Sequence, residues 1–236
     1  MRNEYGNVYS QAELPADRIG DDDAALWTGS LLEWLSVGGD LRAEYRYVDT
    51  PNNESTSEFD VVKGAIYLNA EIIPNRLSIY LDQQVAPGSS LNREAYVRLN
   101  SRSQKWYLAA GQFFLPYGLR LQDDTAFVRL LTGVNFTVPD RGIQFGYLSG
   151  PWVSQIAVTN GSGGGAEIDQ GKQMSWLSSY VRSNWRIGVS FSNNDADVGD
   201  RNMYGVFLGV RTGPIAWLVE ADRITDDVQG LGDRDA

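Results

Sequence analysis

Apolar and polar residues alternate along most of the chain beyond residue 34. In the stretch 35–47 the odd positions carry no charge, whereas the even positions carry Asp40, Arg42, Glu44 and Arg46. A period of two is typical of a β-strand whose two faces meet different surroundings. The stretch is longer than the roughly 5–6 residues of an average strand. It is long enough to cross a bilayer at a tilt, which takes about 9–11 residues.

The same alternation recurs as far as residue 222 and predicts an all-β fold with about eleven strands. Turn-forming residues separate the strands, as at Pro74-Asn75-Arg76 and Gly213-Pro214. The predicted strands cover residues 35–47, 62–72, 77–85, 95–99, 106–115, 143–147, 152–159, 174–182, 187–191, 204–210 and 215–222. The strand at 106–115 is apolar on both faces, so its orientation is not predicted. Consecutive strands joined by turns indicate an antiparallel up-and-down order.

The connections between these strands alternate in length. Short ones fall near residues 74, 102, 150, 184 and 212, and long ones near 53, 88, 128, 166 and 197. Outer-membrane barrels combine short periplasmic turns with longer external loops. Several aromatic residues lie near the short-turn side, as in an interfacial girdle: Trp34, Trp106, Tyr107, Tyr147, Trp152, Trp185 and Trp217. We therefore predict a transmembrane antiparallel β-barrel over residues 31–236, after an N-terminal extension over 1–30.

A soluble antiparallel sandwich is the main alternative fold. Its inner face would be apolar and its outer face polar, which gives the same alternation along each strand. Alternation alone therefore does not separate the two folds. Strand length, loop alternation and the one-sided aromatic residues favour the membrane barrel.

The amino-acid composition excludes several classes of function. Hydrophobic residues make up 42% of the chain and the mean hydropathy is −0.31, an average that a membrane barrel shares with soluble proteins. The net charge of −10, without a basic block, argues against nucleic acid as a partner. The chain has no cysteine and no histidine, so it lacks thiolate ligands, the commonest metal ligand and the usual Ser–His pair. We predict no enzymatic activity, no cofactor and no metal site. Met1 precedes no apolar signal sequence, so a processed or truncated chain is expected.

The stretch Gly111-Gln112-Phe113-Phe114-Leu115-Pro116-Tyr117-Gly118 predicts the end of a strand. Pro116 has no N–H for a sheet ladder, and Gly118 can turn where other residues cannot. The following segment, to residue 141, is too long for a simple hairpin and contains a helix-compatible piece at 125–131. Loops of this length are usually functional. We predict that 116–141 folds inward as a pore constriction that carries Arg120, Asp123, Asp124, Arg129 and Arg141.

These residues carry a resemblance to a known family. The run 111–120, the following Asp123-Asp124 and Phe127-Val128-Arg129, and the strand entry Asp140-Arg141-Gly142 resemble the phosphate-selective porins O and P. The resemblance covers about residues 105–165. It implies a trimeric channel of about sixteen strands or more in the bacterial outer membrane, with a loop folded into the barrel. Since a closed bacterial barrel normally has an even number of strands, about eleven strands indicate an N-terminal or incomplete portion of a longer porin.

The predicted pore wall is balanced in charge. Its inward positions include Asp40, Arg42, Glu44, Arg46, Lys63 and Arg98, with Asp82, Glu220 and Asp222 as further acids. Anion-selective pores present rings of Lys or Arg, so this balance does not support phosphate selectivity, and cross-strand ion pairs that stiffen the wall explain most of these residues. The predicted function is passive diffusion of ions or small solutes, with phosphate-like anions among the candidates. A barrel sleeve around a partner protein and a soluble glycan-binding sandwich are the alternatives.

Overall fold

The computed structural model describes residues 27–32, 34–49, 55–88, 91–119, 127–135, 138–163, 165–166, 170–196, 199–228 and 232–235. These residues form one 13-stranded antiparallel sheet in sequence order and one short helix. The first strands are β1 (Trp27–Leu32), β2 (Leu35–Val48), β3 (Thr56–Ile73), β4 (Leu77–Ala86), β5 (Leu91–Asn100) and β6 (Trp106–Phe113). Then follow α1 (Phe127–Thr132), β7 (Asp140–Ser149), β8 (Trp152–Thr159), β9 (Gln173–Val181), β10 (Trp185–Ala196), β11 (Gly199–Thr212), β12 (Ile215–Val228) and β13 (Gly232–Asp235).

The all-β, up-and-down prediction is therefore confirmed. All of the predicted strands are present, and β1 and β13 add one short strand at each end. β1 begins inside the segment 1–30 that was predicted as an extension, and most of that segment lies outside the described residues.

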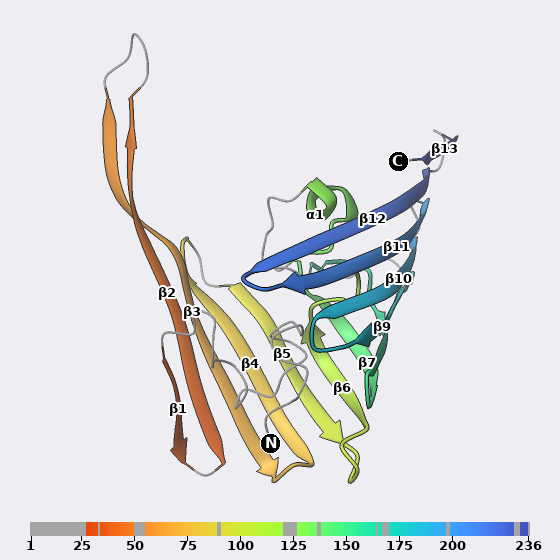
Figure 1. Cartoon of the computed structure of the whole chain (residues 1–236), viewed down its shortest axis with the longest axis horizontal. Coiled ribbons are helices and arrows are strands. Elements are labelled where there is room, and N and C mark those ends of the chain that lie inside the picture. Colours follow the sequence, from red (N-terminus) through yellow and green to blue (C-terminus); the bar gives the residue numbers. More distant parts are fainter. Residues whose placement is uncertain are drawn as a thin grey trace.

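The sheet curls strongly, with β2–β5 on one side and β9–β12 turned across from them (Figure 1). Among the described residues no strand pairing joins β1 to β13, so the sheet is not closed into a barrel. The helix α1 lies beside β12. The curl gives the sheet a concave face, and the described part of the connection between β6 and β7 packs against it.

The two faces of the sheet differ sharply in polarity. Neighbouring residues on β10 illustrate the difference: Val189 is 40% exposed on the convex face, whereas Ser190 is 4% exposed on the concave face. The convex face is a continuous apolar surface, formed by residues such as Ile79, Val97, Leu108, Ile143, Phe145, Ile156, Val158, Ile187, Val206 and Leu208. The concave face carries most of the buried polar residues, among them Asn69, Asp82, Gln144, Gln155, Gln173, Ser175, Ser179 and Ser192. A soluble sandwich has the reverse arrangement, with its apolar faces turned inward.

The structure orients the strand that the sequence left open. On β6, Trp106 and Leu108 lie on the convex face, while Tyr107 and Ala109 are buried on the concave face. The placement of Tyr107 in the aromatic girdle was therefore wrong. Its hydroxyl accepts hydrogen bonds from Gln144 at 3.2 Å and Gln155 at 2.7 Å, which draws it to the polar side. The other six girdle residues are exposed.

The predicted long loop near residue 197 was also wrong. The β10–β11 ladder continues to the pair Ala196–Gly199, so only residues 197–198 connect the strands. Asn193 donates a side-chain hydrogen bond to Asn202 across this ladder at 3.0 Å. Polar residues that were predicted to form a loop are therefore paired between two strands.

The β2–β3 hairpin projects beyond its neighbours (Figure 1). β4 pairs with β3 only from Gly64 onward, so residues 56–63 have no β4 partner. Tyr45 and Phe59 contact each other across this hairpin, with ring centroids 4.9 Å apart.

Candidate functional site

The chain leaves the sheet after β6 and crosses the concave face as an extended strap, residues 114–119. Pro116 cannot continue the ladder, and Gly118 has a φ of +64°, which favours glycine. Leu115 and Tyr117 pack against Met203 and Ile224 on β11 and β12. The strap therefore contacts strands that follow it by as many as 105 residues, and it is buried along its whole length.

Two carboxylates on β12 hold the strap. The hydroxyl of Tyr117 donates to Asp222 Oδ1 at 2.8 Å, and the backbone N–H of Leu119 donates to Glu220 Oε1 at 3.3 Å. A Cβ at Gly118 would collide with the Glu220 carboxylate, so only glycine allows this close approach. These contacts require the strap to lie inward, against the polar face of β12.

Helix α1 supplies the cation that completes this anchor. Arg129 Nη2 pairs with Glu220 Oε2, and the two side chains are only 2% and 5% exposed. Arg129 also donates to the backbone carbonyl of Val134 at 3.5 Å. Glu220 therefore joins α1 and the strap to one point on β12, and we call Tyr117, Arg129, Glu220 and Asp222 the β12 clasp.

The far end of the inward segment is fixed at β7. Asp140 is fully buried, and its carboxylate accepts hydrogen bonds from the N–H groups of Arg141 at 2.8 Å and Gly161 at 2.6 Å. Arg141 is exposed, and its Nε donates to Gln112 at 3.1 Å. Asp140 thus ties the end of the inward segment to the next loop.

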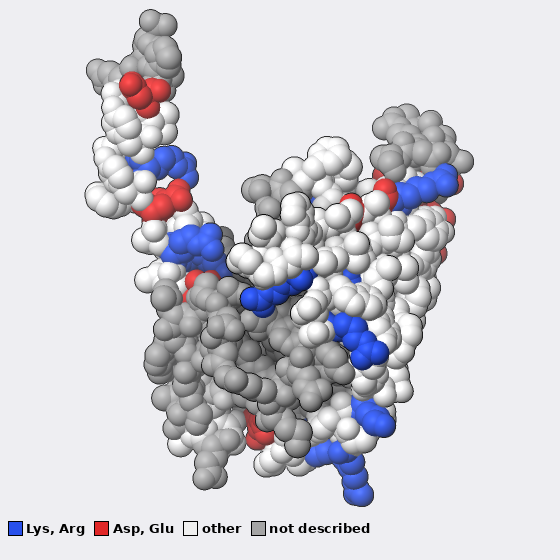
Figure 2. All heavy atoms as spheres, viewed as in Figure 1, with Lys and Arg blue, Asp and Glu red and all other residues white. Residues whose placement is uncertain are grey.

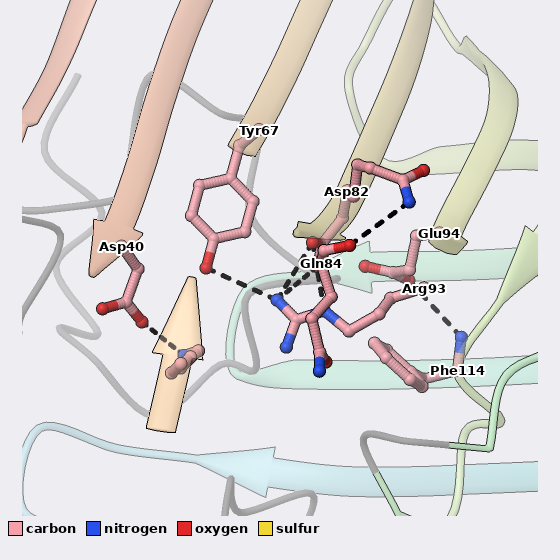
Figure 3. Close-up of polar contacts among 9 residues, drawn as sticks. Asp40, Tyr67, Asp82, Gln84, Arg93, Glu94 and Phe114 are labelled. Atoms are coloured by element: carbon pink, nitrogen blue, oxygen red, sulfur yellow. Dashed lines mark hydrogen bonds and ion pairs between the residues drawn. The ribbon is translucent and has the colours of Figure 1, made fainter. Parts of the chain in front are cut away.

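A second polar network lies on β2–β5 (Figure 3). Arg93 forms a two-point contact with Asp82, from Nη2 to Oδ2 at 2.8 Å and from Nε to Oδ1 at 3.1 Å. The same guanidinium donates to the Tyr67 hydroxyl at 3.4 Å, and Lys63 pairs with Asp40. Glu94 accepts a hydrogen bond from the N–H of Phe114 at 3.4 Å, which connects this network to the strap.

The predicted constriction residues are only partly described. Arg129 lies on the concave face in the β12 clasp, and Arg141 lies at the start of β7. Arg120, Asp123 and Asp124 fall outside the described residues.

The predicted wall residues occupy three different positions. Asp40 and Lys63 pair on the concave face, and Arg98 lies over the ring of Tyr107, 3.8 Å from its centroid. Arg46 contacts Glu44 at 2.6 Å and Glu58 at 3.7 Å on the projecting hairpin, which Figure 2 shows as charges of alternating sign. Arg42 is exposed on the same strand.

Sequence reasoning missed Arg93 and Glu94. Strict alternation places only one of two adjacent residues on a given face, yet both are buried. The register shifts between Asp82 and Gln83, opposite this pair, and such a bulge turns an extra residue inward. The adjacent charges in the middle of an otherwise alternating strand were the only signal in the sequence.

In the β12 clasp and the β2–β5 network, opposite charges lie in contact with each other. The cations of the β12 clasp and of the β2–β5 network each contact a carboxylate, so the charges of these two clusters are paired. Arg98, also on the concave face, contacts the ring of Tyr107 instead. Such a surface can hold water and guide ions.

Comparison with protein-family models and with curated proteins finds no match to this chain. In the part of the chain that the structure describes, no helix is both long and apolar enough to span a membrane.

Proposed function

We propose that the chain forms the wall of a β-barrel channel in the bacterial outer membrane, through which ions or small solutes diffuse passively. The observation that carries the proposal is the polarity of the sheet: its exposed face is apolar and its covered face is polar. Monomeric soluble proteins rarely expose a continuous apolar patch beyond several hundred Å². A lipid bilayer stabilises such a face, and a water-filled lumen stabilises the opposite one.

The strap and α1 form the constriction in this proposal. They lie on the concave face, which would line the lumen, and the β12 clasp holds them there. Charged side chains at a narrow point of a pore set its ion preference. Because those of the clasp and the β2–β5 network are paired, the proposed channel discriminates weakly between anions and cations.

The resemblance to phosphate-selective porins supports a trimeric assembly and a barrel of more strands than the described sheet contains. Phosphate remains a candidate solute through this resemblance. The paired charges on the concave face give no separate support for it.

Cysteine labelling tests the membrane orientation, because the chain has no cysteine of its own. We would introduce Val189→Cys and Val206→Cys on the convex face, with Ser183→Cys in a turn and Ser162→Cys in a loop as controls. In lipid vesicles, a water-soluble maleimide should label at least one control and neither convex site. Full labelling of both convex sites would contradict the proposal, since it would place that face in water.

A further inference from the structure

The short-turn end of the sheet carries more cations than carboxylates. Among the described residues, the one carboxylate that a hydrogen bond places at these turns is Glu71, which accepts the N–H of Asn75 at 3.1 Å. Between β3 and β12 the short connections hold Arg76, Arg102, Lys105 and Arg182, and Arg211 lies at the end of β11. Residues 74–76, 101–105, 150–151, 182–184 and 211–214 include no acidic residue, although acids outnumber bases 30 to 20 in the chain. Glu33, in the β1–β2 connection, lies outside the described residues. We call the five basic residues the basic rim.

The basic rim differs in its pairing from the cations of the β2–β5 network and the β12 clasp. Lys63, Arg93 and Arg129 each contact a carboxylate on the concave face. No rim residue forms an ion pair with any described carboxylate. Arg102, Lys105, Arg182 and Arg211 are exposed and Arg76 is half-buried. Figure 2 shows Lys and Arg atoms at the lower edge, where the β5–β6 turn lies, with one acidic patch nearby, while most acidic atoms lie higher, toward the two upper tips.

Two residues of the basic rim lie beside aromatic residues. Lys105 precedes Trp106 in the chain, and the Arg182 guanidinium lies over the ring of Tyr180, 5.0 Å from its centroid. Tyr180 in turn stacks with Trp185, at a centroid distance of 5.6 Å. Trp and Tyr in membrane proteins concentrate at the level of the lipid headgroups. Cations one to three residues beyond such a belt reach the layer that contains the lipid phosphates.

The wide spacing of the basic-rim residues indicates that they bind an extended surface rather than a compact ligand. Its residues occupy four separate turns along the sheet, and successive short turns are two strands apart, or about 10 Å. A single small anion cannot contact them all, whereas a sheet of anionic headgroups can. We propose that the basic rim binds the phosphate groups of anionic phospholipids in the membrane leaflet at the short-turn end. This inference rests on the proposed insertion of the sheet in a membrane.

The fluorescence of the tryptophans beside the basic rim can report which lipid lies there. The protein is reconstituted into phosphatidylcholine vesicles that contain phosphatidylglycerol, with bromine on the chains of either lipid. Quenching of tryptophan fluorescence then reports which lipid contacts the convex face. One cation near an anionic surface is worth about 1 kcal/mol, so we expect phosphatidylglycerol to be preferred by about fivefold beside the rim.

Two variants separate charge from folding. In one, Arg76, Arg102, Lys105, Arg182 and Arg211 are all changed to Gln, and the preference should fall close to onefold. In the other, the four arginines are changed to Lys and Lys105 to Arg, and the preference should persist. Salt at 0.5 M should weaken it, because the Debye length shortens.

The outcomes distinguish this inference from the proposed function. Equal quenching by the two brominated lipids would overturn the rim inference and leave membrane insertion intact. No quenching by either lipid would contradict insertion itself, and the rim inference with it. Loss of the preference on adding millimolar inorganic phosphate at constant ionic strength would identify a site for free phosphate and overturn a headgroup surface.

Discussion

Arg129 on α1 forms a buried ion pair with Glu220 on β12, 91 residues further along the chain. Glu220 also accepts the N–H of Leu119, so one carboxylate holds both parts of the inward segment. Neither residue is adjacent to the other in the sheet ladder, because α1 lies outside it. The pair therefore fixes where the segment between β6 and β7 crosses the concave face.

The first prediction concerns this ion pair. Arg129→Met should lower the free energy of unfolding by about 3 kcal/mol, because it leaves Glu220 buried without its cation. The double variant Arg129→Met with Glu220→Gln should recover most of that loss, since no buried charge then remains unpaired. Urea unfolding in lipid vesicles, followed by tryptophan fluorescence, gives both values. Equal losses in the single and double variants would show that the charge is solvated and the pair unimportant.

A second prediction concerns the close packing of Tyr107 against the backbone of β7. A Cβ at Gly146 would collide with the hydroxyl-bearing edge of the Tyr107 ring, so Gly146→Ala should cost about 1–3 kcal/mol of stability. Gly209→Ala is the matched control, because its nearest contact would be the flexible end of Leu218 at 3.3 Å. The unfolding midpoints of the two variants in urea should differ clearly. Coinciding midpoints would mean that Tyr107 moves aside without cost.

Much of the fold could be predicted because the strands follow a simple period. The alternation at 35–47 matches β2 in phase, and the strand order follows from turns such as 74–76. The period of two did not predict the strands where polar residues occur on both faces. In the stretch Asn193–Asp200, such residues extend β10 and β11.

The candidate site was less predictable, because its contacts join distant segments. Pro116 and Gly118 indicated that the strand ends, and Arg129 stood out as a charge in an apolar stretch. The partners Glu220 and Asp222 were visible only as inward acids on a late strand. Nothing local in the sequence pairs Tyr117 with Asp222, which lies 105 residues away. Such pairing depends on how the sheet curls.

The third prediction concerns pH and the tip of the β10–β11 hairpin. Loss of hydration and the carboxylates of Asp195 and Asp227 raise the pKa of Asp200. Asp195 and Asp227 are its direct cross-strand partners, and like charges at such positions are destabilising. A carboxyl whose pKa is raised on folding destabilises the folded state when ionised, and this penalty disappears as the pH falls through the folded pKa.

Asp200→Asn should therefore raise the urea midpoint at pH 7 and leave it unchanged at pH 3. Added salt should reduce the gain at pH 7. Asp49→Asn is the control, since Asp49 lies just beyond the end of β2 and outside the strand ladder. A gain that is the same at both pH values would rule out charge repulsion as the cause.

The fourth prediction concerns the inward segment as a constriction. Deleting residues 120–132 should raise the single-channel conductance, because the deletion removes α1 and the Arg129 anchor from the concave face. Deleting Asn52-Asn53, between β2 and β3 on the projecting hairpin, should leave it unchanged. An unaltered conductance after the larger deletion would mean that the segment does not narrow the pore.

Single-channel recording in a planar bilayer across a salt gradient tests the central claim most directly. We expect stable conductance steps with a reversal potential close to zero, because the charges of the β12 clasp and the β2–β5 network are paired. The recording would use protein whose convex cysteines are shown to be protected by lipid. If such inserted protein gave no conductance steps, the result would contradict a channel and favour a barrel sleeve around a partner protein.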